Sequence, residues 1–478
     1  MKVRSVPLLA ALIAMSAAAS AADATDPQEL RALRDEVTRL RDAYEKRIDA
    51  LEKRLAQAET AAAKAQSSAV EAASQAVQAE SAARVAGRRP DAENAFNPAI
   101  SMVLSGMYTN LKNDPAVTPY AIGGFVPSLG EVAPPARGFS LGESEVTIAA
   151  NIDHHFRGAL TLALPPEEGE APAVEEAFIQ TLGLGHGLTA KAGRYLSGIG
   201  YMNEQHAHAW DFSDAPLAYK AFFGNQLRGE GVQLKWLAPT DTFLEFGVEG
   251  GRGGAFPSAE RNKNGFQTGA LFAHVGGDAG SAGSWRAGLS YVKAEPESRA
   301  YEDSDAAGTA TSTSFTGHSK TWVADAVWKW LPGSGRGLTL QAEYFRRTED
   351  GMLATDAAAC LLAPCQGDYR SVQSGWYAQA VYRFLPAWRV GYRYDRLDSG
   401  SLANALAADP ASGLSAADFP ILAAHKPQRN TLMLDWSPSE FSRLRLQYAR
   451  DASQANNPDN QLWLHYIVTL GAHGAHKF

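Results

Sequence analysis

Two histidines separated by a single residue carry the clearest chemical signal in the sequence. His206 and His208 lie in the segment 197–228, and Glu204 and Asp211 flank them. Neutral imidazole nitrogens and carboxylate oxygens are ligands that Zn²⁺ and related borderline cations take. Two histidines at this spacing reach one ion only where the backbone is extended or suitably turned, so a pair that merely packs on a neighbouring ring is the alternative. The pattern predicts a divalent-cation site formed by Glu204, His206, His208 and Asp211.

The only two cysteines, Cys360 and Cys365, are separated by residues 361–364. Thiols of exported proteins meet an oxidising compartment and are normally paired there. If the chain is exported, these two are expected to form one disulfide that closes a small loop.

The first residues predict export. Lys2 and Arg4 precede an apolar run over 6–14, and small residues follow at 19–21. The run is shorter than the roughly 20 residues that a membrane-spanning helix needs. This is the pattern of a cleaved signal peptide, here residues 1–21.

A helical segment is predicted over residues 27–86, which contain no glycine and no proline after Pro27. Leu30, Leu33, Val37 and Leu40 recur at alternating spacings of three and four, with charged residues between them. Such heptads predict a coiled coil. A lone helix of this kind is only marginally stable in water, so the segment is expected to pair with copies of itself in the periplasm.

Beyond residue 97 the apolar period changes from the helical value to two, which is typical of strands with two different faces. Val390 and Tyr392, for example, alternate with Arg389 and Arg393. The expected strands are 100–109, 140–152, 157–164, 175–182, 188–195, 229–238, 242–250, 267–276, 284–294, 320–331, 337–347, 373–384, 388–396, 428–437, 442–450 and 462–470. Alternation alone also fits a soluble β-sandwich.

The connections distinguish these two folds. Short turns alternate with long polar loops, the longest being 110–139, 196–228, 295–319, 348–372 and 397–427. Short turns on one rim and long loops on the other are typical of an outer-membrane β-barrel. The predicted fold is therefore an all-β transmembrane barrel of about sixteen antiparallel strands over residues 97–478, with both ends at the periplasmic rim.

Charged residues at inward positions are predicted to line the pore as two walls, because charges face lipid only at a cost. The acidic wall comprises Glu143, Glu145, Glu245 and Glu249, and the basic wall comprises Arg347, Arg383, Arg389, Arg393, Arg443 and Arg445. Opposed walls would orient polar solutes in the pore. The alternative is that these charges pair with each other and only keep the lumen wet.

The sequence offers no arrangement typical of an enzyme or of a nucleic-acid-binding protein. No nucleophile elbow, metalloprotease helix motif or phosphate-binding loop appears. The net charge is −8 and the pI is about 5.8, whereas a nucleic-acid partner would call for a basic face. We therefore expect neither a nucleic-acid partner nor catalysis nor a resident cofactor, although some outer-membrane barrels are enzymes.

Five segments of the barrel resemble one proteobacterial family of outer-membrane proteins. They are 138–143 (GFSLGE), 156–163 (FRGALTLA), 191–200 (KAGRYLSGIG), 204–212 (EQHAHAWDF) and 470–478 (LGAHGAHKF). The family is often labelled zinc-regulated, TonB-dependent outer-membrane receptor, and the chain is more distantly similar to phosphate-selective porins O and P. The resemblance implies an outer-membrane barrel, a connection with zinc, and a third loop that folds into the pore. TonB-dependent receptors need a plug domain and about 22 strands, so energised transport is not expected here.

The alternating strand before the terminal Phe478 resembles the signal that the barrel assembly machinery recognises, which makes that machinery an expected partner. The predicted function is passive passage of small polar solutes through the outer membrane, with zinc or another divalent cation as the specific substrate. Porins of this size usually associate as trimers, so a homotrimer is expected. The alternative is a structural barrel whose periplasmic coiled coil tethers the outer membrane to the cell wall.

Overall fold

The computed structural model describes residues 98–471 except 118, 129–131, 165–170, 260–263 and 334. It also describes seven positions of the N-terminal segment, all helical, namely Asp35, Thr38, Arg39, Asp42, Glu45, Lys46 and Lys53. Residues 1–95 and 96–478 are separate units. The signal peptide (1–21), the coiled-coil pairing and Phe478 lie outside the described residues.

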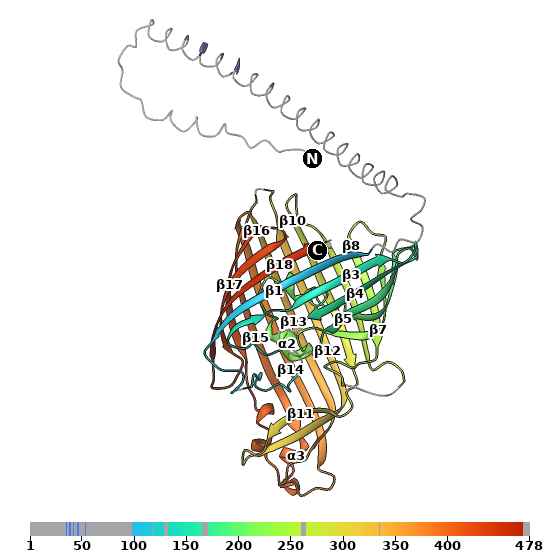
Figure 1. Cartoon of the computed structure of the whole chain (residues 1–478), viewed down its shortest axis with the longest axis vertical. Coiled ribbons are helices and arrows are strands. Elements are labelled where there is room, and N and C mark those ends of the chain that lie inside the picture. The colour runs from blue at the N-terminus through green and yellow to red at the C-terminus, as the bar shows by residue number, and fades with distance from the viewer. Residues whose placement is uncertain are drawn as a thin grey trace, which may run out of the picture. The chain divides into compact units, whose positions relative to one another are not determined.

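Sixteen antiparallel strands close into a single barrel (Figure 1). The strand segments are β1 (Ala99–Leu111), β2 (Gly138–Leu141), β3 (Ser144–Asn151), β4 (Phe156–Leu164), β5 (Ala173–Thr181), β6 (Leu188–Leu196), β7 (Arg228–Leu237), β8 (Phe243–Gly251), β9 (Thr268–Asp278), β10 (Gly283–Ala294), β11 (Arg299–Ser304), β12 (Ala310–Trp330), β13 (Gly337–Thr355), β14 (Gln366–Leu385), β15 (Trp388–Asn404), β16 (Gln428–Ser439), β17 (Ser442–Ala452) and β18 (Asp459–Gly471). Segments β2 and β3 both pair with β1, and β10 and β11 both pair with β12, so each of these pairs is one interrupted barrel strand. Pairing of β1 with β18 closes the barrel, which confirms the predicted strand count and fold.

The two faces of each strand meet different surroundings. On β12, Trp322 is 49% exposed on the outside, while its neighbour Val323 is fully buried inside. Apolar side chains such as Leu432, Leu464 and Tyr466 continue this outer surface around the barrel. An apolar outer band on a closed antiparallel barrel is the architecture of outer-membrane porins. Among the described residues, no helix has the length and apolarity needed to cross a bilayer.

The rim with the long loops differs from the sequence prediction. Segments 295–319, 348–372 and 397–427 were expected to be loops, but β11 to β15 occupy much of them. The strands continue because their inner faces form a second core at this end, in which Phe315 packs edge-on against Tyr369. The short helices α3 (Ala405–Ala408), η2 (Pro410–Ser412), η3 (Ala416–Asp418) and η4 (Pro420–Leu422) cap this core. Cys360 and Cys365, at its edge, form a disulfide, the pair expected from the sequence.

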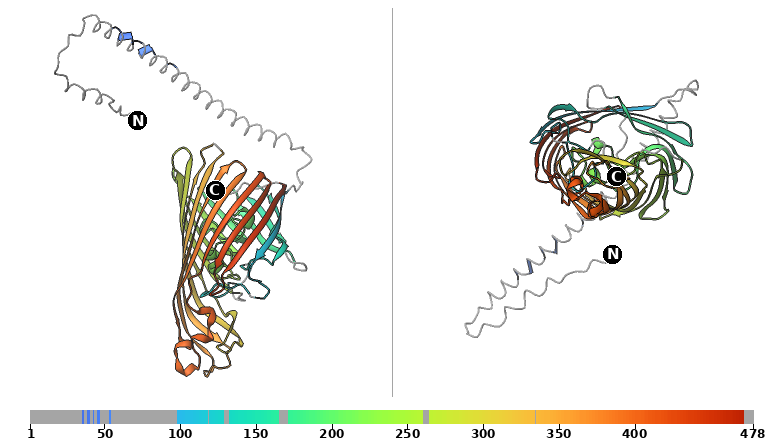
Figure 2. Two further views of the ribbon diagram at one scale, coloured as in Figure 1. Left: turned by 90° about the vertical axis from the view of Figure 1, so that its left-hand side faces the viewer. Right: turned by 90° about the horizontal axis from the view of Figure 1, so that it is seen from below.

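The third loop on this rim, residues 197–227, folds into the barrel, and we call it the lumen loop. It contains η1 (Ala207–Ala209) and α2 (Leu217–Phe223), and α2 lies inside the ring of strands in the view along the barrel (Figure 2). All residues of α2 are buried, with Phe222 stacked on Phe345 of β13. Gly224 ends the helix in the left-handed conformation that glycine adopts without strain. The inward fold of the loop agrees with what the family resemblance implied.

Candidate metal centre in the barrel lumen

The lumen loop is fixed to the late strands of the barrel by a buried ion-pair cluster. The carboxylate of Asp214 contacts the guanidinium of Arg429, lies 3.1 Å from that of Arg393, and lies 3.1 Å from the ammonium of Lys220. All four side chains are less than one tenth exposed. Burial alone would raise the pKa of Asp214, but the three cations hold it well below its usual range. Asp214 is therefore ionised and matched by positive charge on every side.

The predicted basic wall does face the interior, but carboxylates neutralise most of it. The ion pairs within the wall are Asp435 with Arg389, Arg443 and Arg445, Asp395 with Arg393, and Glu349 with Arg347. Asp395 and Glu349 stand on the same strands as their arginines, and Asp435 stands on β16, between the arginines of β15 and β17. The two-wall prediction left all three carboxylates out. Arg383 differs, because it is exposed and makes no ion pair among residues 98–471 as described. The alternative in which charges pair with each other thus holds for most of this wall.

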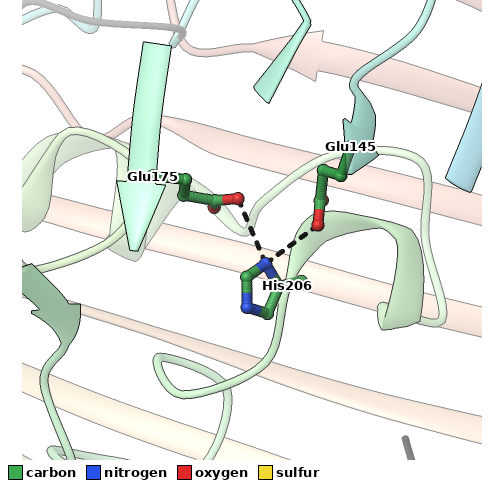
Figure 3. Close-up of side chains that lie close together, drawn as sticks. All are labelled: Glu145, Glu175 and His206. Atoms are coloured by element: carbon green, nitrogen blue, oxygen red, sulfur yellow. Dashed lines mark hydrogen bonds and ion pairs between the residues drawn. The ribbon is translucent and has the colours of Figure 1, made fainter. Parts of the chain in front are cut away.

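The opposite side of the lumen loop contacts three glutamates of the early strands. His206 Nδ1 lies 3.1 Å from Glu145 Oε2 and 3.1 Å from Glu175 Oε2 (Figure 3). His206 Nε2 lies 3.0 Å from Glu176 Oε2, and His208 Nδ1 lies 3.0 Å from Glu145 Oε1. One ligand atom each from Glu145, Glu175 and His206 can be chosen so that all lie within 4.8 Å of one another. We call the five residues Glu145, Glu175, Glu176, His206 and His208 the metal cluster.

The contacts of His206 assign different roles to its two ring nitrogens. Glu176 is itself held by the backbone N–H of Leu196, 3.0 Å from its Oε1. A carboxylate that accepts the N–H of one ring nitrogen fixes the tautomer and leaves the other nitrogen for a cation. Glu176 would play that part on Nε2, which leaves Nδ1 facing Glu145 and Glu175.

Without an ion, a proton can occupy the same position. Burial by itself would lower the pKa of His206, but its hydrogen bonds to Glu145, Glu175 and Glu176 raise it well above the ordinary value. The imidazolium then satisfies the surrounding carboxylates. A divalent cation can replace this proton because it brings the positive charge that the glutamates need.

The structure brings together only part of the site predicted from the sequence. His206 and His208 meet, with ring centroids 5.7 Å apart, but Glu204 lies 2.7 Å from the ammonium of Lys235. Asp211 lies 2.7 Å from the guanidinium of Arg389. Of the four residues predicted, the structure therefore brings only the two histidines together. Glu204 and Asp211 each pair with a cation of the barrel wall that the loop sequence does not reveal.

Glu175 and Glu176 were missed for a reason specific to strands. Adjacent strand residues normally point to opposite faces. The register of β5 against β4 shifts here, since Thr161 pairs with Glu176 and Leu162 pairs with Val174. Glu175 is thus the extra residue of a β-bulge, a device that re-aims side chains. The bulge brings both carboxylates to His206, and the only sequence signal was the Glu-Glu pair itself.

The other three predicted acidic residues lie outside the metal cluster. Glu249 accepts hydrogen bonds from the Ser197 hydroxyl (2.5 Å) and the Gly198 backbone (2.8 Å), which fixes the start of the lumen loop. Glu245 lies between Lys235 and His274, at 3.6 and 3.2 Å. Glu143 stands in the interruption between β2 and β3.

The metal cluster borders a cavity of about 710 Å³ in the lumen. Glu145, Glu176, His206 and His208 line one part of this cavity, and Arg383 and Arg389 line another. A solute in the cavity can therefore reach groups of both charge signs.

No protein-family model matches the chain. An uncharacterized protein of Aquifex aeolicus (strain VF5) is 29% identical over 423 residues, which cover 81% of this chain and 81% of that protein.

Among solved structures, the outer membrane protein OmpT of Vibrio cholerae in a trimer form is 10% identical and has a TM-score of 0.47, covering 78% of this chain and 99% of its own. The outer membrane channel DcaP of Acinetobacter baumannii is 11% identical with a TM-score of 0.46, at 78% and 97% coverage. An anion-selective porin from Comamonas acidovorans is 11% identical with a TM-score of 0.45, at 78% and 99% coverage. The porin-like fold of this chain rests on its own closed topology and apolar outer band.

Proposed function

We propose that the protein is an outer-membrane channel for small polar solutes with a specific site for a divalent cation, zinc among the candidates. The observation that carries the proposal is the metal cluster, in which Glu145, Glu175 and His206 offer convergent ligand atoms beside a lumen cavity. Carboxylate and imidazole ligands together suit Zn²⁺ and other borderline divalent cations. The zinc connection implied by the family resemblance points to the same chemistry.

The lumen position of the cluster favours cargo over a structural metal. The lumen loop is already anchored through Asp214 and through α2, so no ion is needed to hold it. A channel site must also release what it binds. Competition with the proton on His206 would keep the affinity moderate at neutral pH.

Calorimetric titration of the purified, full-length protein with Zn²⁺ tests the site. Replacing both His206 and His208 with Ala should abolish binding, while Glu204→Gln, in the same lumen loop but paired with Lys235, should leave it unchanged. Unchanged zinc binding by the double variant, or its loss in Glu204→Gln, contradicts the proposed ligand set.

Single-channel recording tests the channel. The wild type should conduct, and Zn²⁺ should alter its current but not that of the His206→Ala/His208→Ala variant. A barrel that is silent at all voltages would contradict the channel and favour the tether between outer membrane and cell wall.

We further propose a homotrimer, which size-exclusion chromatography with light scattering in mild detergent would reveal. A full-length protein that is monomeric under those conditions contradicts the trimer without affecting the metal site.

A further inference from the structure

Arginines near the short-turn rim outnumber the carboxylates that face them. Arg383 on β14 is the direct cross-strand neighbour of Arg389 on β15. Like charges directly opposite each other destabilise a strand pair. Arg389 in turn is opposite Asp435, which is opposite Arg445. One row of the inner face therefore carries three cations and one anion.

The neighbouring carboxylates do not correct this excess. The single carboxylate of Asp435 contacts three arginines, namely Arg389, Arg443 and Arg445. The only other carboxylate in contact with this group is Asp211, on Arg389, among the residues that the structure describes. Arg443 also donates a hydrogen bond to the backbone carbonyl of Trp210, 3.3 Å away. The guanidinium of Arg383 makes no ion pair within the described range.

These arginines surround a cavity of about 240 Å³. Arg383, Arg389 and Arg443 line it, and we call it the arginine pocket. The adjoining turn adds the hydroxyls of Ser437, Ser439 and Ser442 and one exposed carboxylate, Glu440. Three arginines therefore face a single carboxylate in the lining of this pocket. Guanidinium groups match the planar fork of a carboxylate or the oxygens of a phosphate, and such charge-assisted hydrogen bonds are strong.

His208 connects the arginine pocket with the metal cluster. His208 Nδ1 lies 3.0 Å from Glu145 Oε1, and His208 is also one of the residues that line the arginine pocket. Arg383 and Arg389 likewise border both the arginine pocket and the larger cavity that contains the metal cluster. A cation held by the cluster and an anion held by the arginines would therefore lie in adjoining spaces.

We propose that the arginine pocket binds a carboxylate group of a small polycarboxylate, and that pocket and cluster together accept a divalent metal ion carried by such a chelator. The second half of this inference rests on the proposed metal site, and the first half does not. The chelator contributes free carboxylates to Arg383, Arg389 and Arg443, and the metal it carries meets Glu145, Glu175 and His206. Two weak contacts with one solute are stronger than either alone.

Calorimetry with citrate as the probe, on the full-length protein in detergent, tests the arginine pocket. Without zinc, the wild type should bind citrate, and Arg383→Gln should weaken binding about tenfold, as expected for one lost hydrogen bond between charged groups. Arg383 has no ion-pair partner among described residues, so its loss should not disturb the fold. Arg336→Gln, an exposed arginine in the turn before β13 at the same rim, is the matched control and should bind citrate as the wild type does. Equal citrate affinity in wild type and Arg383→Gln overturns the pocket.

A second set of titrations uses preformed zinc–citrate, Zn²⁺ alone and inorganic phosphate. Zinc–citrate should bind the wild type more tightly than citrate does, and Glu175→Gln should remove that gain but leave zinc-free citrate binding intact. If zinc alone fails to bind the wild type while citrate binds, the metal site and the chelate are wrong and the pocket stands. If phosphate binds and citrate does not, the polycarboxylate assignment is overturned in favour of an inorganic anion.

Discussion

The lumen loop contacts the barrel wall through two charged regions of opposite design. On the late strands, Asp214 meets Arg393, Arg429 and Lys220. The two arginines also pair with Asp395 and Asp451, so protein charges of both signs balance there. On the early strands, His206 meets three glutamates, and the positive charge between them can come from a proton on the ring or from another cation. The first region needs nothing from solution, whereas the second can exchange its central charge for another cation.

This difference separates holding the loop from binding a solute. Arginine keeps its charge at any physiological pH, so a cluster of aspartate and arginine holds the loop permanently. We call the ion-pair cluster of Asp214 with Arg393, Arg429 and Lys220 the fastening. Imidazole can lose its proton or bind a metal ion, so the occupancy of a His–Glu cluster can change with pH and with the metal concentration. Because the fastening lies elsewhere, the cluster can change its occupant while the loop keeps its place.

The largest expected effect comes from breaking the fastening. Asp214→Ala leaves Arg393, Arg429 and Lys220 buried without their common anion, which should lower the free energy of unfolding by about 3–5 kcal/mol. Asp241→Ala, in an exposed turn, is the control and should change it by less than about 0.5 kcal/mol. Urea unfolding in detergent, followed by tryptophan fluorescence, measures both. An equal decrease in the free energy of unfolding for Asp214→Ala and Asp241→Ala would show that the ion pairs of Asp214 do not hold the lumen loop.

The metal cluster should respond in affinity instead of stability. Glu176→Gln removes the carboxylate that orients the His206 ring, and such losses typically weaken metal binding by about 10- to 100-fold. The barrel should unfold at the same urea concentration as the wild type. A variant with unaltered zinc affinity would show that Glu176 does not orient the ring.

The disulfide at the long-loop rim should have a smaller effect that stays local. Closing so short a loop is worth about 2 kcal/mol at most, and it constrains a tip beyond the barrel. Cys360→Ser with Cys365→Ser should leave zinc binding unchanged. Alkylation without reductant, followed by mass spectrometry, should find no free thiol in the wild type, and labelled cysteines would refute the disulfide.

The smallest expected effect is that of moderate acid on the fastening. The pKa of Asp214 is depressed, so its contribution to stability is complete above the ordinary value of about 3.9 and is lost only as the pH falls below it. The groups that face it are Arg393, Arg429, Lys220 and the amide of Gln447. The two guanidinium groups keep their charge over this range. Hydrogen exchange of residues 211–224 should therefore show equal protection at pH 7 and pH 5, after correction for the intrinsic rate. Loss of protection near pH 5 would contradict the assigned pairing.

The sequence predicts the barrel better than it predicts the site. Alternation at residues such as Val390 and Arg393 follows from the two faces of a strand, and loop lengths distinguish the rims, so local patterns determine both. The lengths of β12 to β15 were underestimated, because the core around Phe315 and Tyr369 forms only once the strands are side by side.

The histidines could be singled out by residue type, but their partners could not. Glu145 lies 61 positions from His206 in sequence, and Glu175 reaches it only through a β-bulge. Nearby Glu204 and Asp211 looked equally suitable, yet Lys235 and Arg389 pair with them in the folded barrel. The pairing of carboxylates with cations is determined by which strands become neighbours in the closed barrel. It therefore cannot be predicted from the loop sequence alone.

A crystal structure of the protein grown with zinc, with anomalous diffraction recorded at the zinc absorption edge, tests the central claim most directly. We expect one anomalous peak in the lumen at coordination distance, about 2 Å, from His206 Nδ1 and from carboxylate oxygens of Glu145 and Glu175. A peak beside Glu204 and Asp211, or a lumen with no anomalous peak at saturating zinc, would contradict it.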